Sequence, residues 1–293
     1  MNLFLSVLQI VAPVFILAGL GYFWVKAGFE YRIQFVTSMA MTLSVPCLIF
    51  TALMKTEINP IDLKNVLLAS LACYFFATVA TFVLVKAIGL NFRTFFSPML
   101  FGNTGNIGLP VCLFAYGSVG FDFAVVVFAV MAIYNFTFGI WIVSGGGSPI
   151  KVLKEPLIPA VFLGTLCLAN GWQTPEFLTN TLELIGQMAI PLMLITVGVA
   201  IARMNGTGLT QVIWPALGKF IVCLGCALFS VWIFELPKVA GAVLILQVTT
   251  PVAVTSYLLA EKYGADAEAV ASLVIVSTLL SVLYIPLSLA FLI

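Results

Sequence analysis

Long apolar stretches with almost no charged residue follow one another from the first residues of the chain to the last. The segment from Leu3 to Val25 carries no charge, and a helix of that length can cross the hydrocarbon layer of a bilayer. Charged residues make up 8% of the chain, against roughly a quarter in soluble globular domains. The pattern therefore predicts an all-α polytopic membrane protein and excludes a soluble globular fold.

Charges and turn residues divide the chain into ten predicted transmembrane helices, so both termini should lie on one side of the membrane. Lys and Arg gather in cytoplasmic loops, and here the loops of one side carry eight of them and the loops of the other side three. We therefore expect a multi-pass protein of the cell (inner) membrane with both termini outside the cytoplasm. The predicted spans are 3–25, 33–54, 65–85, 95–117, 123–143, 156–170, 184–202, 212–234, 239–260 and 269–292. The richer side has Lys26, Arg32, Lys86, Arg93, Lys151, Lys154, Arg203 and Lys262, and the other side has Lys55, Lys64 and Lys238.

Prolines recur at similar spacing in the two halves of the chain, which predicts an internal repeat because proline inside a helix is costly. The matched pairs are Pro13 and Pro159 (146 apart), Pro46 and Pro191 (145), Pro110 and Pro251 (141), and Tyr116 with Tyr257 (141). Five spans per half would make the second copy enter the membrane from the opposite side. We expect two inverted five-helix repeats, residues 1–147 and 148–293, joined at the polar segment from Gly145 to Glu155. Pro46 and Pro191 are best explained as packing kinks.

The fourth and ninth spans are each interrupted by polar residues, glycine or proline. We expect one half-helix to end near Gly102 and another to start near Pro110, with a corresponding break before Pro251. Broken backbone within the hydrocarbon layer is tolerated only where protein, water or a ligand satisfies it. Matching breaks in inverted repeats should cross near the middle of the membrane and point to the substrate site of a transporter.

Two half-helix N-termini at the crossing would favour an anion such as a carboxylate, because they present positive dipole ends and free N–H groups. The polar side chains around the breaks could add neutral hydrogen bonds. The alternative is that these groups only satisfy the broken backbone and bind nothing. The candidate substrate-binding residues are Asn103, Thr104, Asn106, Gly108, Pro110, Gln247, Thr249, Thr250 and Pro251.

Two further residues are candidates for coupling or for support of the site. Lys219 is the one charge well inside a predicted span, and intramembrane charges are often functional. It could instead snorkel to the cytoplasmic face from about 10 Å depth. Asn135 could approach the crossing or bond a neighbouring helix.

Other chemistries find no support in the residues. The chain has no histidine, and its Cys223–Cys226 pair lies in mid-helix without a second pair, so we expect no metal site and no cofactor. Nothing suggests nucleic acid as a partner, because the net charge is +1 and no basic cluster alternates with aromatic residues. No catalytic constellation is present, so we do not expect an enzyme.

The breaks resemble those of a known family. Asn103 and Thr104 open the pattern N-T-x-x-x-G-x-P-x-x-x-x-x-Y-G, and Pro251 opens P-x-A-V-x-S-x-L-L-A-E-x-Y-G. Both resemble the crossovers of the auxin efflux carrier family, and the segments 155–164 and 175–201 are similar to its bacterial members, including malonate and other organic-anion permeases. The likeness covers the whole chain, although the long loop between spans 5 and 6 of the plant members is short here.

The resemblance implies secondary or facilitative transport of small organic anions such as malonate, malate or an indole carboxylate. It implies a scaffold of spans 1, 2, 6 and 7, a transport unit of spans 3–5 and 8–10 that moves like an elevator, and a homodimer formed through the scaffold within the lipid. By the same resemblance, Asn103 would meet the substrate carboxylate. The alternative is a cation or proton exchanger on the same fold. The related bile-acid sodium symporters bind sodium with acidic side chains near the crossover, which this chain lacks there.

Overall fold

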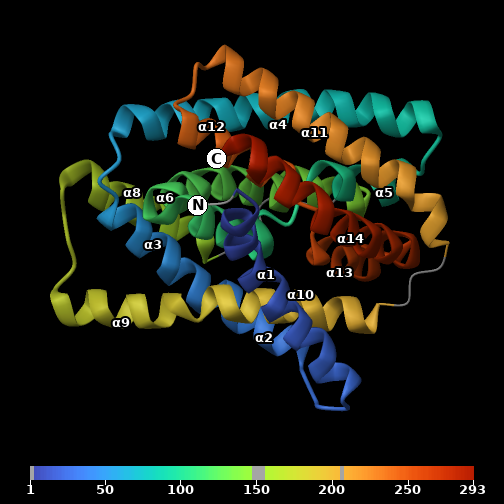
Figure 1. Ribbon diagram of the computed structural model, residues 1–293, viewed down its shortest axis with the longest axis horizontal. Helices are drawn as coiled ribbons and strands as arrows, with labels where there is room; N and C mark the ends of the chain where they lie inside the picture. The colour runs from blue at the N-terminus through green and yellow to red at the C-terminus, as the bar shows by residue number, and fades with distance from the viewer. Residues whose placement is uncertain (1–2, 147–155, 205–207) are drawn as a thin grey trace.

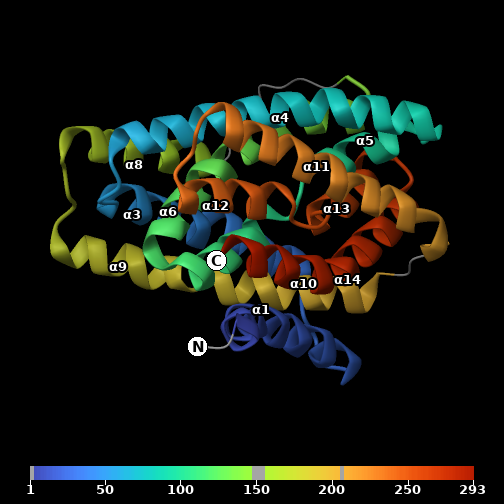
Figure 2. The same cartoon turned by 45° about the horizontal axis from the view of Figure 1, so that its top comes forward.

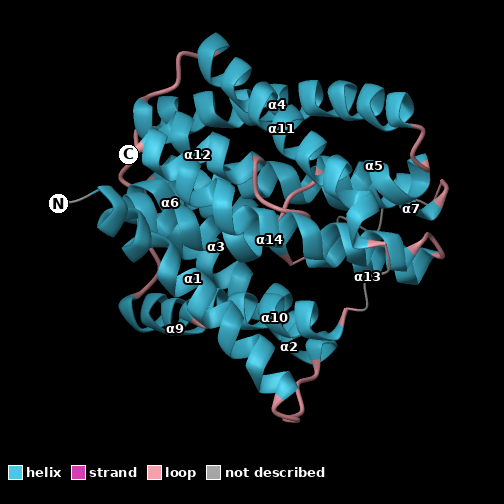
Figure 3. Cartoon of the chain, turned by 45° about the vertical axis from the view of Figure 1, so that its right-hand side comes forward, coloured by secondary structure: helices cyan, strands magenta, loops and turns pink. Residues whose placement is uncertain are grey.

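The computed structural model describes residues 3–146, 156–204 and 208–293, and within these ranges the protein is helical throughout (Figures 1 and 3). Lys151, Lys154 and the expected repeat boundary at 147/148 lie outside the described residues. The helices are α1 (Leu3–Lys26), α2 (Ile33–Met39), η1 (Ala40–Ser44), α3 (Val45–Lys55), α4 (Pro60–Ile88), α5 (Phe92–Leu100), η2 (Thr104–Gly108), α6 (Leu109–Tyr134), η3 (Asn135–Gly139), α7 (Ile140–Ser144), α8 (Leu157–Asn170), α9 (Glu176–Gln187), α10 (Ala189–Arg203), η5 (Leu209–Val212), α11 (Ile213–Ile233), α12 (Lys238–Val248), α13 (Val254–Tyr263) and α14 (Ala267–Leu292).

Seven helical stretches among the described residues are long and apolar enough to cross a membrane, and α8 and α12 are shorter apolar helices. Large apolar side chains stand on the outside of the molecule: Trp214 is 75% exposed, Trp232 74% and Phe291 89%. Such exposure would be costly in water and is unremarkable against lipid tails. The structure therefore agrees with the predicted polytopic membrane protein.

Helix ends follow local sequence signals. Asn59 caps α4 by accepting a hydrogen bond from the Ile61 N–H, and Pro60 takes the first helical position, so α4 begins before the predicted span 65–85. Asp266 caps α14 in the same way. Helix α9 begins at Glu176, ahead of the predicted span 184–202. Its first two turns contain polar residues, so the apolar pattern alone did not include them.

The prolines inside the long helices coincide with changes in helix geometry. The π-helical turns η1 and η2 lie directly before Pro46 and Pro110. Helix α9 ends at Gln187, the residue whose carbonyl would clash with the ring of Pro191 four positions on. A π-turn or a helix break relieves this clash. The packing kinks expected at Pro46 and Pro191 are thus distortions that begin just before each proline.

The helices pack in pairs. α1 packs most extensively on α10, α3 on α8, α4 on α11 and α6 on α12. Figure 1 shows α4 and α11 along one edge and α9 and α10 end to end along the opposite edge, with α6 and α14 between them, and Figure 2 shows α1 on the outside of α10. The interior between these edges is where two non-helical segments meet.

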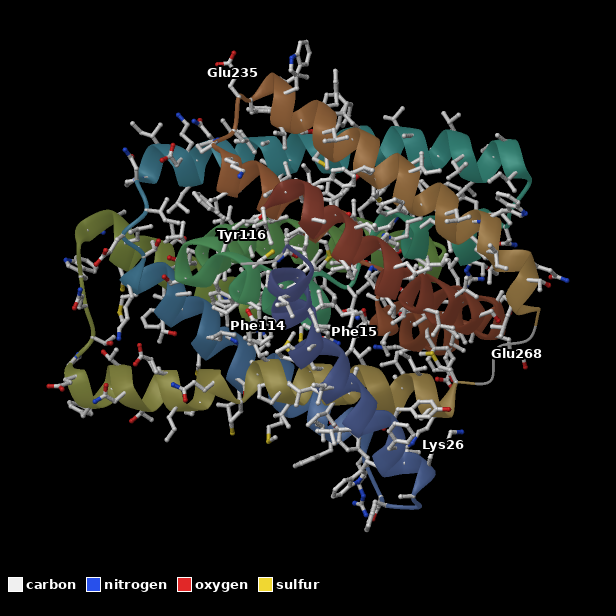
Figure 4. All side chains as sticks on the ribbon, in the orientation of Figure 1. Phe15, Lys26, Phe114, Tyr116, Glu235 and Glu268 are labelled. Atoms are coloured by element: carbon white, nitrogen blue, oxygen red, sulfur yellow. The ribbon has the colours of Figure 1, made fainter. Side chains whose placement is uncertain are left out.

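The loops lie at two ends of the molecule. In Figure 1 the α3–α4, α8–α9 and α11–α12 connections are on the left, and the α4–α5 and α13–α14 connections are on the right. Figure 4 places Lys26 and Glu268 in the right half and Phe114 and Tyr116 in the left half. The long axis of the molecule therefore joins two loop-bearing ends.

Candidate functional site

Two extended segments meet inside the helical bundle, as the paired breaks predicted. Residues 101–103 separate α5 from η2, and residues 249–253 separate α12 from α13. Gly102 and Val252 form an antiparallel bridge, and the Asn103 N–H donates to the Pro251 carbonyl at 2.7 Å. We call these two segments the crossover. Figure 3 shows non-helical segments running through the middle of the helices.

Gly102 is the residue that allows close contact between the two segments of the crossover. A Cβ at this position would overlap Thr250 Oγ1 and lie 2.9 Å from the Thr250 carbonyl oxygen. Any other residue would therefore push the segments apart. The sequence reasoning used Gly102 only as a helix end and missed this contact.

The first half-helix after the break begins at Thr104, in the turn η2, rather than near Pro110 as predicted. The Asn103 carbonyl accepts hydrogen bonds from the Ile107 and Gly108 N–H groups, which starts the helix early. Pro110 is then an inner position of the helical run. The first N–H groups of a helix have no partner within it, so the free N–H groups of this half-helix lie at the crossover itself.

Two polar side chains at this helix start have an unpaired atom. Asn103 is 4% exposed and its Nδ2 has no hydrogen-bond partner, and Thr104 is fully buried with an unpaired Oγ1. Buried polar groups in proteins are almost always hydrogen-bonded, and each exception needs an explanation. A bound group that accepts hydrogen bonds would satisfy both atoms.

Gln247 reaches the same half-helix from α12. Its side chain lies against Gly108, where a Cβ would overlap Oε1, and its Nε2 donates to the Ala124 carbonyl at 3.5 Å. Gln247 Oε1 is buried without a partner. Gln247, Gly108 and Asn103 thus belong to one buried region, although Gly108 contributes only space.

The threonines of the second break are occupied by the backbone. Thr249 Oγ1 donates to the Ile245 carbonyl and Thr250 Oγ1 to the Gln247 carbonyl, both at 2.7 Å. These bonds satisfy carbonyl groups at the end of α12. These two hydroxyls therefore satisfy the broken backbone, which was the alternative to binding a ligand. The second strand is also held by Ser277 of α14, whose Oγ accepts the Val252 N–H at 3.0 Å. No sequence signal distinguished Ser277 from other serines in apolar helices.

Two other predicted residues lie beside the crossover. Asn106 is half-buried, one turn into the helical run. Asn135 is buried in η3, and both its Oδ1 and the Phe101 ring crowd Gly139, so Asn135 lies against the start of the first break.

Lys219 points into the protein. It is 2% exposed, and its Nζ donates to the Thr250 carbonyl at 2.7 Å. The snorkelling interpretation is therefore wrong, because the side chain turns toward the crossover and not toward the end of α11. Gly102 lies against Thr250, so the ammonium group of Lys219 is bonded directly to a residue at the contact between the two segments of the crossover.

Helix α10 packs against the half-helix that follows the first break. A Cβ on Gly105 would lie 3.3 Å from Met193 Cε of α10 and 2.9 Å from Phe128 Cε2 of α6. η2 therefore packs directly on α10, and the buried polar atoms of Asn103 and Thr104 lie close to this boundary.

Two neighbouring cavities with shared lining residues lie at the end of the molecule that carries Arg32 and Arg203. One of about 410 Å³ is lined by Arg32, Arg203 and Leu258, among others. A smaller one of about 50 Å³ shares Arg203 and Leu258 and reaches Val254, the first residue of α13. Arg203 thus lines both cavities, whereas Arg32 is paired with Glu30 at 2.6 Å. Two other cavities, of about 320 and 630 Å³, are lined almost entirely by apolar side chains away from the crossover.

Asp122 is a buried carboxylate that the sequence reasoning assigned to a loop. It is 9% exposed, lies in α6 shortly after a break at Gly117, and interacts with the side chain of Thr56. Because α6 restarts directly at Gly117, no loop separates the fourth and fifth predicted spans. Asp122 and Lys219 are the two buried charged side chains within the described residues.

The two breaks do not follow the predicted spacing of 141 residues. Pro110 lies within a helical run, whereas Pro251 lies within the extended segment, so matching these two prolines is wrong. The bridge pairs Gly102 with Val252, and Gly117 and Gly264 both have positive φ, 64° and 67°, after a tyrosine. The prolines misled because Pro110 lies in the first turn of α6, whereas Pro251 lies between α12 and α13.

Comparison with known proteins gives one family and two distant relatives. Residues 146–289 match the family described as membrane transport protein. An "Uncharacterized transporter" of Methanocaldococcus jannaschii is 23% identical over 96% of this chain and 97% of its own length. A "Putative malonate transporter" of Rhizobium meliloti is 22% identical over 93% of this chain and 92% of its own length. Both similarities extend over nearly the whole chain.

Proposed function

Since the chain is a membrane transporter of the membrane transport protein family, as its resemblance to auxin efflux carriers indicated, we propose that it carries a small organic anion across the cell membrane. The observation that carries this proposal is the pair of unpaired, buried polar atoms, Asn103 Nδ2 and Thr104 Oγ1, at the start of a half-helix. A carboxylate bound there would accept both hydrogen bonds and face the positive end of the helix dipole.

The substrate class is a small carboxylate. The relative named for malonate supports a short dicarboxylate, and the cavities lined by Arg203 support an anion that approaches from this end of the molecule. Within this proposal Asn103 and Thr104 hold one carboxylate and Gln247 and Asn106 limit the size of the molecule. Thr249, Thr250 and Pro251 shape the opposite strand, and Gly108 and Pro110 shape the first half-helix.

We propose that the chain crosses the membrane ten times, with the seven long apolar stretches and the shorter α8 and α12 among these crossings. The helical stretch Thr104–Ser144 has 41 residues, or about 60 Å of helix, which is twice the thickness of the hydrocarbon layer. The stretch is kinked at Gly117, where φ is positive, so in this proposal it serves as the end of one crossing and the whole of the next. In this topology both termini are extracytoplasmic and the end with Arg32 and Arg203 is cytoplasmic.

The packing favours two inverted repeats divided into a scaffold and a transport unit. α1 packs on α10, which pairs span 1 with span 7, and α8 packs on α3, which pairs span 6 with span 2. In each pair the first span of one half packs on the second span of the other half, as inverted repeats would require. The remaining helices pack mainly on one another, and η2 meets α10 at the boundary. An elevator movement would slide the crossover past α10. A homodimer through the scaffold within the lipid completes the proposal.

The direct test is uptake of radiolabelled malonate, malate and an indole carboxylate into proteoliposomes, with proton, sodium and voltage gradients imposed separately. Asn103→Ala should lower kcat/KM by roughly 10- to 100-fold, the cost of one hydrogen bond to a charged group, and leave folded protein in the membrane. Asn170→Ala, an exposed residue at the far end of α8, is the matched control and should behave like the native protein. Equal kinetics in Asn103→Ala would rule out the assigned site. Dissipation of an ion gradient without flux of any carboxylate would favour an exchanger instead.

A further inference from the structure

Lys219 presents a charge problem that the binding of a carboxylate alone does not address. Its ammonium group is buried inside the membrane-spanning part of the protein and donates to a neutral carbonyl, that of Thr250. The ion pairs within the described residues, Arg32 with Glu30 and Lys55 with Glu183, lie elsewhere. Asp122, the other buried charge of the described residues, interacts with Thr56. A buried charge without an opposite charge is expensive, so this lysine needs an explanation.

The helix ends around the crossover compensate the ammonium group only in part. The carbonyl end of α12 carries partial negative charge and favours a cation, and Lys219 donates to the Thr250 carbonyl just beyond this end. The starts of η2 at Thr104 and of α13 at Val254 carry partial positive charge. The positive charge of the ammonium group is therefore only partly offset by the helix ends, within a segment shielded from water.

We propose that Lys219 is the fixed countercharge of the transported anion. A bound monoanion makes the crossover electrically neutral, and a bound dianion leaves one net negative charge. This inference rests on the proposed function and adds the charge state of the loaded carrier. Because Lys219 lies on α11 and its acceptor lies on the crossover, both in the proposed transport unit, the charge travels with the substrate.

The inference makes a prediction about voltage. Moving one full charge through 100 mV changes an equilibrium by about 50-fold. In homo-exchange, labelled external substrate replaces unlabelled internal substrate, and only the loaded carrier moves. Exchange of a monoanion should therefore be insensitive to voltage. Exchange of a dianion should depend on voltage, because the loaded carrier then has one net negative charge.

The experiment uses malonate, a dianion at pH 7.5, and its monoamide malonamate, a monoanion of nearly the same shape. Exchange is measured in proteoliposomes with valinomycin-clamped potentials of 0 and −100 mV. In the native protein we expect malonamate exchange to be equal at the two potentials and malonate exchange to change several-fold. Voltage-dependent malonamate exchange would overturn the inference without any variant.

Variants separate a charge role from a packing role. Lys219→Met removes the charge, so malonamate exchange should acquire the voltage dependence that malonate exchange has in the native protein. Lys219→Arg keeps the charge, so malonamate exchange should stay independent of voltage. If malonamate is not carried, Lys219→Met should steepen the voltage dependence of malonate. A lysine that only holds the Thr250 carbonyl would change rates but not voltage dependence, and that result would reject the proposal. Absence of exchange with either substrate in the native protein would reject the proposed function together with this inference.

Discussion

At the scale of single residues, hydrogen bonding separates side chains that await a ligand from side chains that the backbone already uses. Thr104 and Thr249 stand next to the two breaks and look equivalent in the sequence. The hydroxyl of Thr104 is buried and unpaired, whereas that of Thr249 donates to the Ile245 carbonyl. Their roles should therefore differ.

Substitution by valine, which has the same shape, tests this difference. Thr104→Val should raise the KM for the carried carboxylate by roughly 10-fold or more, because a hydrogen bond to a charged group is lost. Thr249→Val should change the KM by less than about twofold, since its hydroxyl bonds the protein. Initial rates of uptake over a range of substrate concentrations measure both. An equal effect of the two substitutions would contradict the assignment.

Gly102 is the residue on which the crossover geometry depends most. Gly102→Ala would place a methyl group into Thr250 and should destabilise the folded protein by roughly 2 kcal/mol or more, because the nearest atoms include backbone. Gly19→Ala is the control, since no atom lies within 4 Å of its added Cβ and alanine favours a helix. Thermal unfolding in detergent should show a lower midpoint for Gly102→Ala and an equal or higher one for Gly19→Ala.

At the scale of helices, small residues decide which pairs approach closely. Gly198 of α10 touches the Ala18 carbonyl of α1, and Gly21 of α1 touches the Ile195 carbonyl of α10, so the two backbones are in direct contact. Close approach through glycine is how helices associate inside a bilayer, where the hydrophobic effect does not drive them together.

This contact predicts a stability difference between two glycines in long apolar helices. Gly198→Ala should lower the midpoint of thermal unfolding by several degrees, because the added Cβ overlaps backbone that cannot move away. Gly225→Ala in α11, with open space around its Cβ, should leave the midpoint unchanged or raise it. An equal loss in both variants would mean that helix propensity, and not the α1–α10 contact, sets the outcome.

At the scale of the whole molecule, the topology can be tested by labelling from one side. Gln173, between α8 and α9, and Lys26, at the end of α1, are exposed at opposite ends of the proposed topology. A membrane-impermeant maleimide added to intact cells should label Gln173→Cys and spare Lys26→Cys until the membrane is opened. The half-buried native Cys47, Cys167 and Cys226 are first replaced by alanine. Labelling of Lys26→Cys in intact cells would reverse the proposed orientation.

The sequence by itself determined that the fold is a polytopic helical membrane protein and that two broken segments interrupt its helices. Apolar segments without charge can only be stable in lipid, and two broken segments within them require partners for their backbone. That argument located Asn103, Gln247 and Pro251 at one crossover before any geometry was known. It also indicated the family through motifs that surround the breaks.

Only the tertiary structure decided which polar atoms are free and where the lysine points. Thr104 and Thr249 have the same chemistry, and the difference lies in whether a carbonyl of the preceding turn is within reach. Lys219 could equally have pointed to either end of its helix, and the position of the Thr250 carbonyl on a distant segment settled its direction. The antiparallel bridge between Gly102 and Val252, 150 residues apart, likewise shows which residues of the two breaks face each other. Such contacts depend on which segments meet in space, and local sequence patterns do not encode that information.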